Sequence, residues 1–264
     1  MFPFSDASVH HRTFPYVNSG LIGISVLVFL YEMYLGGFGT LTGNGDRDLD
    51  IFFLKWGFIS QELTSGNEFL RFGPHNIETP VHTVFTVFSS MFMHGGFMHI
   101  ASNMMFLWVF GDNIEDRFGH AKYLAFYILT GIAATLAQWA INTDSQAPLI
   151  GASGAISGVL GAYLVIYPHN KVKALIVLFI ITVLELRAMW LLGAWFVWQL
   201  LQGSISLGMA DSVGVAFFAH IGGFAAGMLL ATGYKLYNGE PLLPGRDRRV
   251  EAWDSWYQSG RSRD

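Results

Sequence analysis

The sequence predicts an all-α integral membrane protein, built as a bundle of six spanning helices. Hydrophobic residues make up 52% of the 264 positions and charged residues only 13%, which is not the composition of a water-soluble domain. Long apolar segments also alternate with polar connections along the chain. The lipid bilayer is therefore the first expected partner, and no stripe of basic and aromatic residues indicates a nucleic acid.

The predicted membrane domain covers residues 20–237, between a polar segment at 1–19 and a polar tail at 238–264. No cleaved leader is expected in the first segment, because no small-residue cleavage site follows the apolar run after it. The apolar segments predicted to span the bilayer lie at about residues 20–35, 97–110, 123–141, 151–167, 188–201 and 217–236.

The connections between the early spans differ in length. Residues 36–80 form a long outer loop between spans one and two, and its many aromatic residues predict that it is partly embedded in the membrane. Residues 83–93 are expected to form a short helix that leads into the second span. Residues 111–122 are expected to form a charged hairpin loop between spans two and three.

The distribution of lysine and arginine predicts the orientation of the chain. With six spans, 12 of the 15 basic residues fall on one side, and only Arg47, Lys55 and Arg71 fall on the other. Basic residues concentrate on the cytoplasmic side of a membrane. We therefore expect a multi-pass protein of a bacterial or archaeal plasma membrane, with both termini in the cytoplasm. The second, fourth and sixth spans then begin at the outer face.

Small residues open the fourth span. The motif Gly151-Ala-Ser153-Gly154 is followed by Gly158, and glycines four residues apart let another helix approach closely. Ser153 lies in the first turn of the predicted helix, which is expected to end before Pro168.

The sixth and second spans carry polar residues at their starts. His220 shares a helical face with Gly223 and Gly227, three and seven residues further on. His99 and Asn103 are four residues apart and so share a face of the second span. All of these residues begin spans that start at the outer face, so we expect them at one depth.

Ser153 and His220 have the chemistry of a nucleophile and its general base. A serine hydroxyl is a weak nucleophile until a base takes its proton, and histidine is the usual base. The backbone N–H of Ser153 and the side chains of His99 and Asn103 are candidates for stabilising an oxyanion. Together these groups predict hydrolysis of peptide bonds within the membrane.

The apolar segment at residues 172–184 is predicted not to cross the membrane. It is short for a helical span. If it crossed, Ser153 and His220 would lie on opposite sides of the hydrocarbon, about 30 Å apart. We therefore expect this segment to return or to lie at the cytoplasmic interface.

Other interpretations of these residues stay open on the sequence alone. Small-residue faces often serve helix packing only, and a lone histidine in a span can be a packing residue or part of a proton path. A metal site made of His94, His99 and His220 lacks a His-Glu-x-x-His motif and a carboxylate on those spans. Residues 43–46 match the Gly-x-Gly-Asp motif of intramembrane aspartyl proteases, but they lie in a polar loop and are interpreted as a turn.

Four motifs resemble, in order and spacing, those of the rhomboid intramembrane serine proteases. They are His94-x4-His99-x3-Asn103, Glu115-x-Arg117-x-Gly119, Gly151-Ala-Ser153-Gly154 and Ala219-His220-x2-Gly223-x3-Gly227, within residues 83–236. The resemblance implies a six-span bundle of rhomboid type, a catalytic dyad at Ser153 and His220, and an oxyanion hole lined by His99 and Asn103. It also implies that His94 is structural and that Glu115 and Arg117 brace their loop.

The sequence departs from this family in two places. Some members have a tyrosine four residues after the serine, which stacks on the catalytic histidine, and this chain has Ser157 there. The Trp-Arg signature of the family's long loop has no clear counterpart in residues 36–80.

We expect a serine endopeptidase that cleaves transmembrane segments of other membrane proteins, without a metal or a cofactor. The alternatives are an inactive relative that binds membrane clients and a small transporter. The transporter alternative is disfavoured, because the chain has no inverted repeat and no paired carboxylates in its spans.

Overall fold

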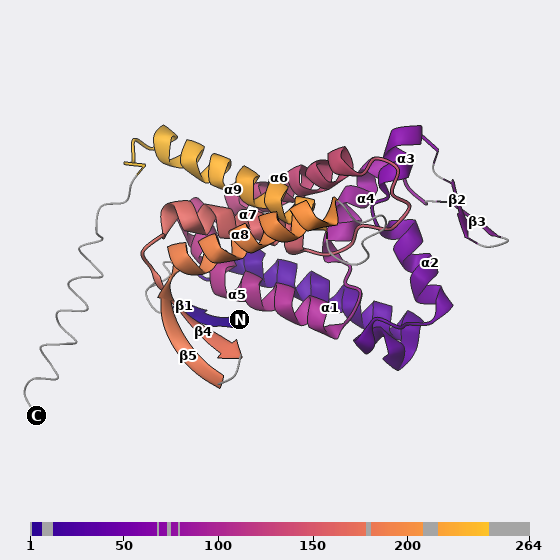
Figure 1. Cartoon of the computed structure of the whole chain (residues 1–264), viewed down its shortest axis with the longest axis horizontal. Helices are drawn as coiled ribbons and strands as arrows, with labels where there is room; N and C mark the ends of the chain where they lie inside the picture. The colour runs from indigo at the N-terminus through magenta and orange to yellow at the C-terminus, as the bar shows by residue number, and fades with distance from the viewer. Residues whose placement is uncertain are drawn as a thin grey trace, which may run out of the picture.

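A computed structural model describes residues 2–6, 13–67, 69–72, 75–78, 80–177, 181–207 and 216–242. Helices dominate this part of the chain and pack as one bundle (Figure 1). The six longest lie where the sequence predicts spans: α1 (Tyr16–Gly36), α5 (Phe97–Phe118), α6 (His120–Ile141), α7 (Ser153–Ile166), α8 (Ala188–Ser206) and α9 (Phe217–Tyr237). Most of the polar tail predicted at 238–264 lies outside the described residues.

Length and composition identify fewer crossings than six. Among the described residues, three helical segments are long and apolar enough to cross a bilayer: Tyr16–Thr42, His120–Ile141 and Phe217–Tyr237. A fourth is added if the bent pair Thr83–Phe92 and Phe97–Phe118 is one broken span. The protein is therefore a helical membrane protein, and the count of six spans stays a prediction.

The helix predicted at residues 83–93 is present as α4 (Thr83–Ser89) followed by the 3-10 helix η2 (Ser90–Phe92). The direction of the chain then changes by 83° before α5 begins. Residues 93–96, with Gly95 and Gly96 at their end, make this break. The bend places the start of α5 beside the start of α7, where η2 contacts α7.

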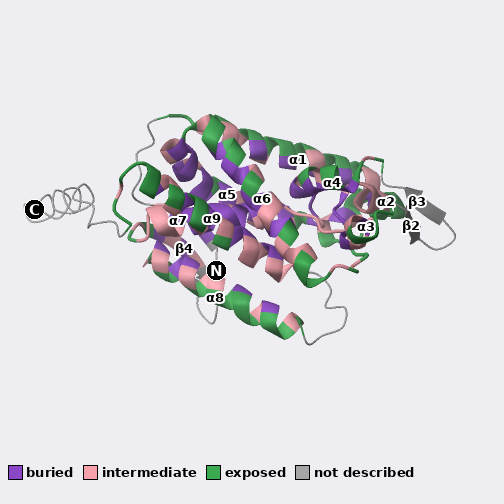
Figure 2. Ribbon diagram, turned by 90° about the horizontal axis from the view of Figure 1, so that it is seen from above, coloured by how far each residue is buried: buried purple, intermediate pink, exposed green. Residues whose placement is uncertain are grey.

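α7 lies in the middle of the bundle, in contact with α5, α6, α8 and α9. Its residues from Ala155 to Tyr163 are all buried, so it has no exposed polar face. Figure 2 shows the buried residues concentrated around α5, α6, α7 and α9, whereas α8 lies at the edge and is largely exposed. The central position of α7 depends on its many small residues, because they let several helices approach it at once.

α7 and α9 approach each other backbone to backbone. A Cβ atom added at Gly223 would collide with the carbonyl oxygen of Gly154, and one at Gly227 would collide with that of Gly158. The two small-residue faces predicted from the sequence are therefore the surfaces on which these helices meet. Each glycine removes a side chain that would hold the helices apart.

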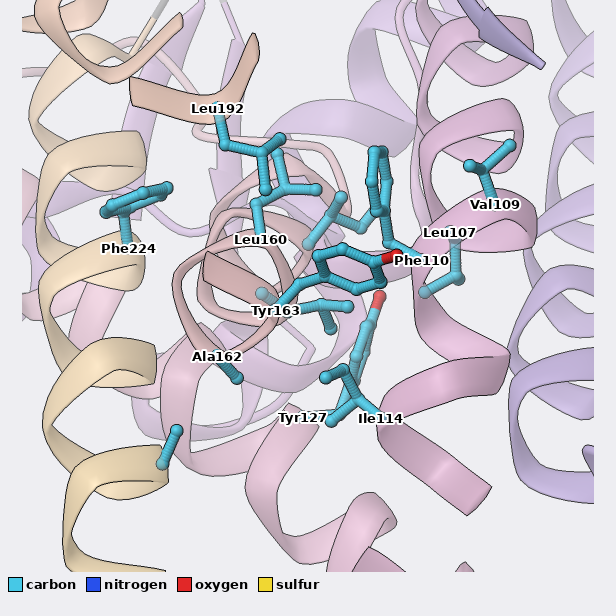
Figure 3. Close-up of a cluster of buried hydrophobic side chains, with 14 of the residues drawn as sticks. Leu107, Val109, Phe110, Ile114, Tyr127, Leu160, Ala162, Tyr163, Leu192 and Phe224 are labelled. Atoms are coloured by element: carbon cyan, nitrogen blue, oxygen red, sulfur yellow. The ribbon is translucent and has the colours of Figure 1, made fainter. Parts of the chain in front are cut away.

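An aromatic core lies between α5, α6 and α7 (Figure 3). Tyr163 of α7 meets the ring of Phe110 edge-on, with the ring centroids 4.9 Å apart. Leu107, Ile114 and Tyr127 belong to the same buried cluster. Within a bilayer, helices associate through close packing of side chains instead of through transfer out of water. This cluster therefore holds α7 firmly against α5.

The described residues of the segment 172–184 form strands, which the all-α prediction did not include. β4 (Lys171–Val177) pairs antiparallel with β5 (Ile181–Arg187), so that Lys171 lies opposite Arg187. The segment therefore returns to its starting point, as predicted, although its side of the membrane stays a prediction. β1 (Phe2–Asp6) pairs with the other edge of β4. The many β-branched residues of this segment favour strands over a helix.

Residues 36–80 contain more regular structure than the expected loop. The 3-10 helix η1 (Gly37–Thr42) is followed by α2 (Arg47–Trp56), α3 (Ser60–Ser65) and the strand pair β2 (Phe69–Phe72) and β3 (His75–Glu78). These elements lie at the end of the bundle away from the three-stranded sheet (Figure 1). Phe58 pairs with Leu149, which precedes α7, and this pairing joins the segment to the core. Its embedding in the membrane stays a prediction.

The charged hairpin loop predicted at residues 111–122 is wrong. α5 continues to Phe118 and α6 begins at His120, so Gly119 alone makes the turn, with a φ of 81° that favours glycine. The acidic side chains in this stretch need no solvated loop, because partners hold them. The Glu115 carboxylate accepts the backbone N–H groups of Val17 and Asn18 at the start of α1, at 2.9 and 2.7 Å.

The contact between α7 and α9 predicts that Gly227→Leu destabilises the protein. The leucine side chain would collide with the backbone of Gly158, which cannot move without shifting α7. Overpacking of this kind costs at least about 1–3 kcal/mol, so we expect the unfolding temperature in detergent to fall by about 5 °C or more. Gly233→Leu is the matched control, because a Cβ there has no neighbour within 4 Å. Equal unfolding temperatures for the two variants would contradict this packing.

Candidate active site

Ser153 and His220 lie within hydrogen-bond distance, although they are 67 residues apart in the sequence. Ser153 is the first residue of α7, and His220 lies in the first turn of α9. The Nε2 atom of His220 is 2.8 Å from the Oγ atom of Ser153. This pair is the one that the sequence predicts, and the glycine contacts between α7 and α9 bring it together.

Two residues of α8 hold the ring of His220. The Oε1 atom of Gln199 accepts a hydrogen bond from Nδ1 at 2.8 Å. The ring of Trp195, one turn earlier, lies with its centroid 6.0 Å from that of His220. With its proton on Nδ1, the imidazole presents the lone pair of Nε2 to the Ser153 hydroxyl. Ser157, which replaces the expected tyrosine, donates instead to the Ser153 carbonyl oxygen at 2.6 Å.

Gly151 lies between Ser153 and His99, and the position of its missing side chain defines the space between them. A Cβ atom added at Gly151 would lie 2.8 Å from the Nε2 atom of His99 and 3.6 Å from the Oγ atom of Ser153. The Nδ1 atom of His99 accepts the backbone N–H of Gly95 at 3.3 Å. Nε2 therefore carries the proton of a neutral His99 and points toward this space. Gly151 has a φ of 125°, which favours glycine.

The side chain of Asn103 and the backbone N–H of Ser153 are further candidate donors. Asn103 is buried on α5, and its Nδ2 atom has no hydrogen-bond partner among the described residues. The Ser153 N–H lies in the first turn of α7, where backbone donors have no partner within the helix. A developing negative charge on an oxygen beside Ser153 would satisfy such donors.

His94 is held by a carboxylate that the sequence analysis did not identify. Glu32 of α1 is fully buried and accepts the backbone N–H of His94, at 3.1 and 3.3 Å. The Nδ1 atom of His94 lies 3.1 Å from the carbonyl oxygen of Phe92, and its ring meets that of His99 edge-on at 5.1 Å. His94 therefore contacts both the bend before α5 and the ring of His99.

Glu115 and Arg117 connect helix ends instead of bracing a loop. Glu115 binds the N-terminus of α1 and also lies within hydrogen-bond distance of the His120 ring. Arg117 forms an ion pair with Glu240, just after α9, and its carbonyl oxygen accepts the Tyr234 hydroxyl at 3.0 Å. These contacts tie α1, α5 and α9 together at one end of the bundle.

The supporting residues Glu32, Gln138 and Gln199 were missed by sequence reasoning. Gln138 of α6 accepts the backbone N–H of Ala219 at 3.2 Å and so positions the start of α9. All three interrupt apolar segments of the sequence. Polar residues inside membrane segments are functional candidates by default, so their position was a usable signal.

The metal site and the aspartyl-protease motif, the two alternative chemistries considered from the sequence, have no further support in the described residues. Within that part of the chain, no group of three His, Cys, Asp or Glu side chains is placed to hold a metal ion. Residues 43–46 form the connection between η1 and α2, and the turn in it is at Gly43, with a φ of 78°, instead of at the Asn44-Gly45 pair.

Comparisons with known proteins agree on one family. The family model of the rhomboid domain matches residues 81–236. RHOMBOID-like protein 5 of Arabidopsis thaliana is 32% identical over 61% of this chain and 49% of its own length. Rhomboid protein 1, mitochondrial, of Saccharomyces cerevisiae is 30% identical over 65% of this chain and 47% of its own length. Presenilin-associated rhomboid-like protein, mitochondrial, of Homo sapiens is 29% identical over 62% of this chain and 40% of its own length.

The chain spans about half the length of the curated relatives that it matches. These relatives are eukaryotic, and two are named mitochondrial, so they do not support the bacterial or archaeal plasma membrane expected from the sequence. The assignment to a membrane depends on the apolar helices.

The space beside Gly151 predicts that Gly151→Ala suppresses the reactivity of Ser153. The added methyl group would displace the His99 ring, and alanine is strained at a φ of 125°. Loss of one oxyanion donor costs on the order of 10²-fold, so we expect a similar fall in the rate at which a fluorophosphonate labels Ser153. Gly66→Ala is the control, because Gly66 also has a positive φ but no neighbour within 4 Å. Unchanged labelling of Gly151→Ala would contradict the role of this space.

Proposed function

The chain belongs to the rhomboid family, and we propose that it is an intramembrane serine endopeptidase. It hydrolyses peptide bonds in or near transmembrane segments of other membrane proteins. The single observation that carries this proposal is the hydrogen bond between Ser153 Oγ and His220 Nε2. A serine paired with a neutral imidazole is the arrangement of an activated nucleophile.

In the first step, His220 Nε2 takes the hydroxyl proton of Ser153 while Oγ attacks the carbonyl carbon of the substrate. The tetrahedral intermediate then collapses, the C–N bond breaks, and the proton passes from His220 to the leaving amine. In the second step, His220 takes a proton from a water molecule, whose oxygen attacks the acyl ester. The ester bond breaks and Ser153 recovers its proton.

The carbonyl oxygen becomes negatively charged in each tetrahedral intermediate. We propose that it occupies the space between Ser153 and His99, where the Ser153 N–H, the His99 Nε2–H and the Asn103 amide donate to it. The Cβ distances at Gly151 and the unpartnered Nδ2 of Asn103 support this assignment. Donors fixed before the reaction stabilise the developing charge without reorganisation.

We propose six spans for the bundle, with both termini in the cytoplasm. Ser153 and His220 share a depth, because α7 and α9 both begin at the end of the bundle that carries α2 and α4. Ser153 then lies near the outer face, and a substrate helix must unwind near its own outer end to present a carbonyl group.

The dyad predicts that Ser153→Ala and His220→Ala each abolish cleavage of a model transmembrane substrate in liposomes. Both residues act in one nucleophilic step, so we expect each variant to lose at least about 10³-fold in kcat. Both variants should unfold near the wild-type temperature. EDTA should have no effect, because no metal takes part.

Cleavage by either variant at the wild-type rate would rule out the dyad. If the folded wild type takes up substrate in crosslinking but neither cleaves it nor reacts with a fluorophosphonate, the protein is instead an inactive client-binding relative. Full inhibition by EDTA would favour a metal.

The proposed topology can be tested with single cysteines, because the chain has no native cysteine. In intact bacteria that express the protein, we expect Asp211→Cys, at a position outside the described residues, to react with an impermeant thiol reagent. Lys171 and Arg187 lie opposite each other at the open end of the hairpin β4–β5, so both should lie on the same side of the membrane. Because we propose that this side is cytoplasmic, Lys171→Cys and Arg187→Cys should be protected. Labelling of Arg187→Cys from outside would overturn both the topology and the shared depth of the dyad.

A further inference from the structure

Gln199 is a polar side chain in the otherwise apolar middle of α8. It is only 7% exposed, although α8 lies at the edge of the bundle and many of its neighbours are exposed. Its side chain points inward, and Oε1 lies 2.8 Å from the Nδ1 atom of His220. A buried amide costs free energy unless it is hydrogen-bonded, so this bond gives its position a physical reason.

The bond determines which nitrogen of His220 is free to act as a base. The amide oxygen of Gln199 is an acceptor, so Nδ1 of the imidazole is the donor and carries the proton. Nε2 is then unprotonated and faces the hydroxyl of Ser153. Without this acceptor, the proton can move to Nε2, and the ring can no longer take a proton from Ser153.

The ring has few other restraints. Ser157 does not hold it, because the Ser157 hydroxyl donates to the backbone of its own helix. Trp195 lies against the ring, with 39° between the ring planes, and so limits its tilt without selecting a tautomer. Gln199 and Ser153 make the hydrogen bonds of the His220 ring within the described part of the chain.

We propose that Gln199 is a positioning residue for His220, and that it has the place of the carboxylate in a Ser-His-Asp triad. This inference rests on the proposed function. A neutral amide can accept the same hydrogen bond without the cost of burying a charge among the apolar residues of α8 and α9. The amide selects the reactive tautomer but stabilises the imidazolium less than a carboxylate does.

The test compares Gln199→Leu with Gln202→Leu. Both variants replace a glutamine by an apolar residue of similar size on α8, but Gln202 makes no hydrogen bond with His220 in the described structure. For a model transmembrane substrate in liposomes, we expect Gln199→Leu to lower kcat on the order of 10²-fold, with KM within about twofold of wild type. Labelling of Ser153 by a fluorophosphonate should slow by a similar factor. Gln202→Leu should match wild type in both measurements.

Gln199→Glu provides a second readout that a purely structural role would not change. The glutamate keeps the acceptor and adds a charge that stabilises protonated His220, so kcat should largely recover. The acid limb of its pH profile should move to higher pH than in wild type. Among the described residues, His99 is the titratable side chain whose charge influences His220. It is the same in the wild type and in Gln199→Glu.

Three outcomes would overturn the inference. The first is a wild-type kcat in Gln199→Leu, and the second is an unchanged acid limb in Gln199→Glu. The third is an equal loss of activity in Gln199→Leu and Gln202→Leu, which would indicate a general effect on α8. If Gln199→Leu does not fold, the pH profile of Gln199→Glu decides alone. Failure of the proposed function can be distinguished from failure of this inference. If the proposed function is wrong, the wild type itself neither cleaves the substrate nor reacts with the fluorophosphonate, and the inference is then wrong as well.

Discussion

The contact between the backbones of α7 and α9 is the constraint on which the rest of the structure depends. Gly223 and Gly227 lie against the carbonyl oxygens of Gly154 and Gly158, with no room for a side chain. Ser153 lies at the start of one of these helices and His220 in the first turn of the other. Their side chains reach each other because the two axes are close. The small residues in the middle of the bundle thus position Ser153 and His220, a role that loops have in many soluble enzymes.

Burying polar groups in this bundle requires partners for them, and the partners come from helices distant in sequence. Glu115 satisfies two N–H groups at the start of α1, and Glu32 satisfies one, that of His94 at the bend before α5. Gln138 accepts the N–H of Ala219 at the start of α9. Each bond fixes the end of one helix on the side of another. Because an unpaired polar group in an apolar medium is costly, these contacts select a single arrangement of the helix ends.

The sequence predicted the parts of the fold that follow from periodicity and from apolar length. The six long helices follow from such patterns, and the meeting of Ser153 with His220 follows from the small-residue faces of two spans. The return of the segment 172–184 was predicted from the common depth that these two residues require. The helical turn at Gly119 was not predicted, because charge normally indicates a solvated loop and the partners of Glu115 are nearly 100 residues away. The strands β4 and β5 were not predicted either. The pairing of β4 with β1 is a contact between distant segments, which hydropathy does not encode.

The supporting residues were beyond a motif-based analysis for a related reason. Gln199 and Glu32 match no short motif, and their roles depend on which helix their side chains face. In the sequence, each is recognisable only as a polar residue within an apolar segment. Such positions are best interpreted by asking which buried donor or acceptor elsewhere in the chain lacks a partner.

The bend of 83° between η2 and α5 interrupts the hydrogen bonds that a helix makes along its own backbone. A continuous helix pairs its own backbone groups, whereas a break leaves several of them open. Within a bilayer, an open backbone is stable only where protein or water covers it. Glu32 covers the N–H of His94, and the N–H of Gly95 pairs with His99. These contacts satisfy the break without a continuous helix, so an irregular stretch of backbone can lie inside an apolar bundle, next to the segment that leads into α7.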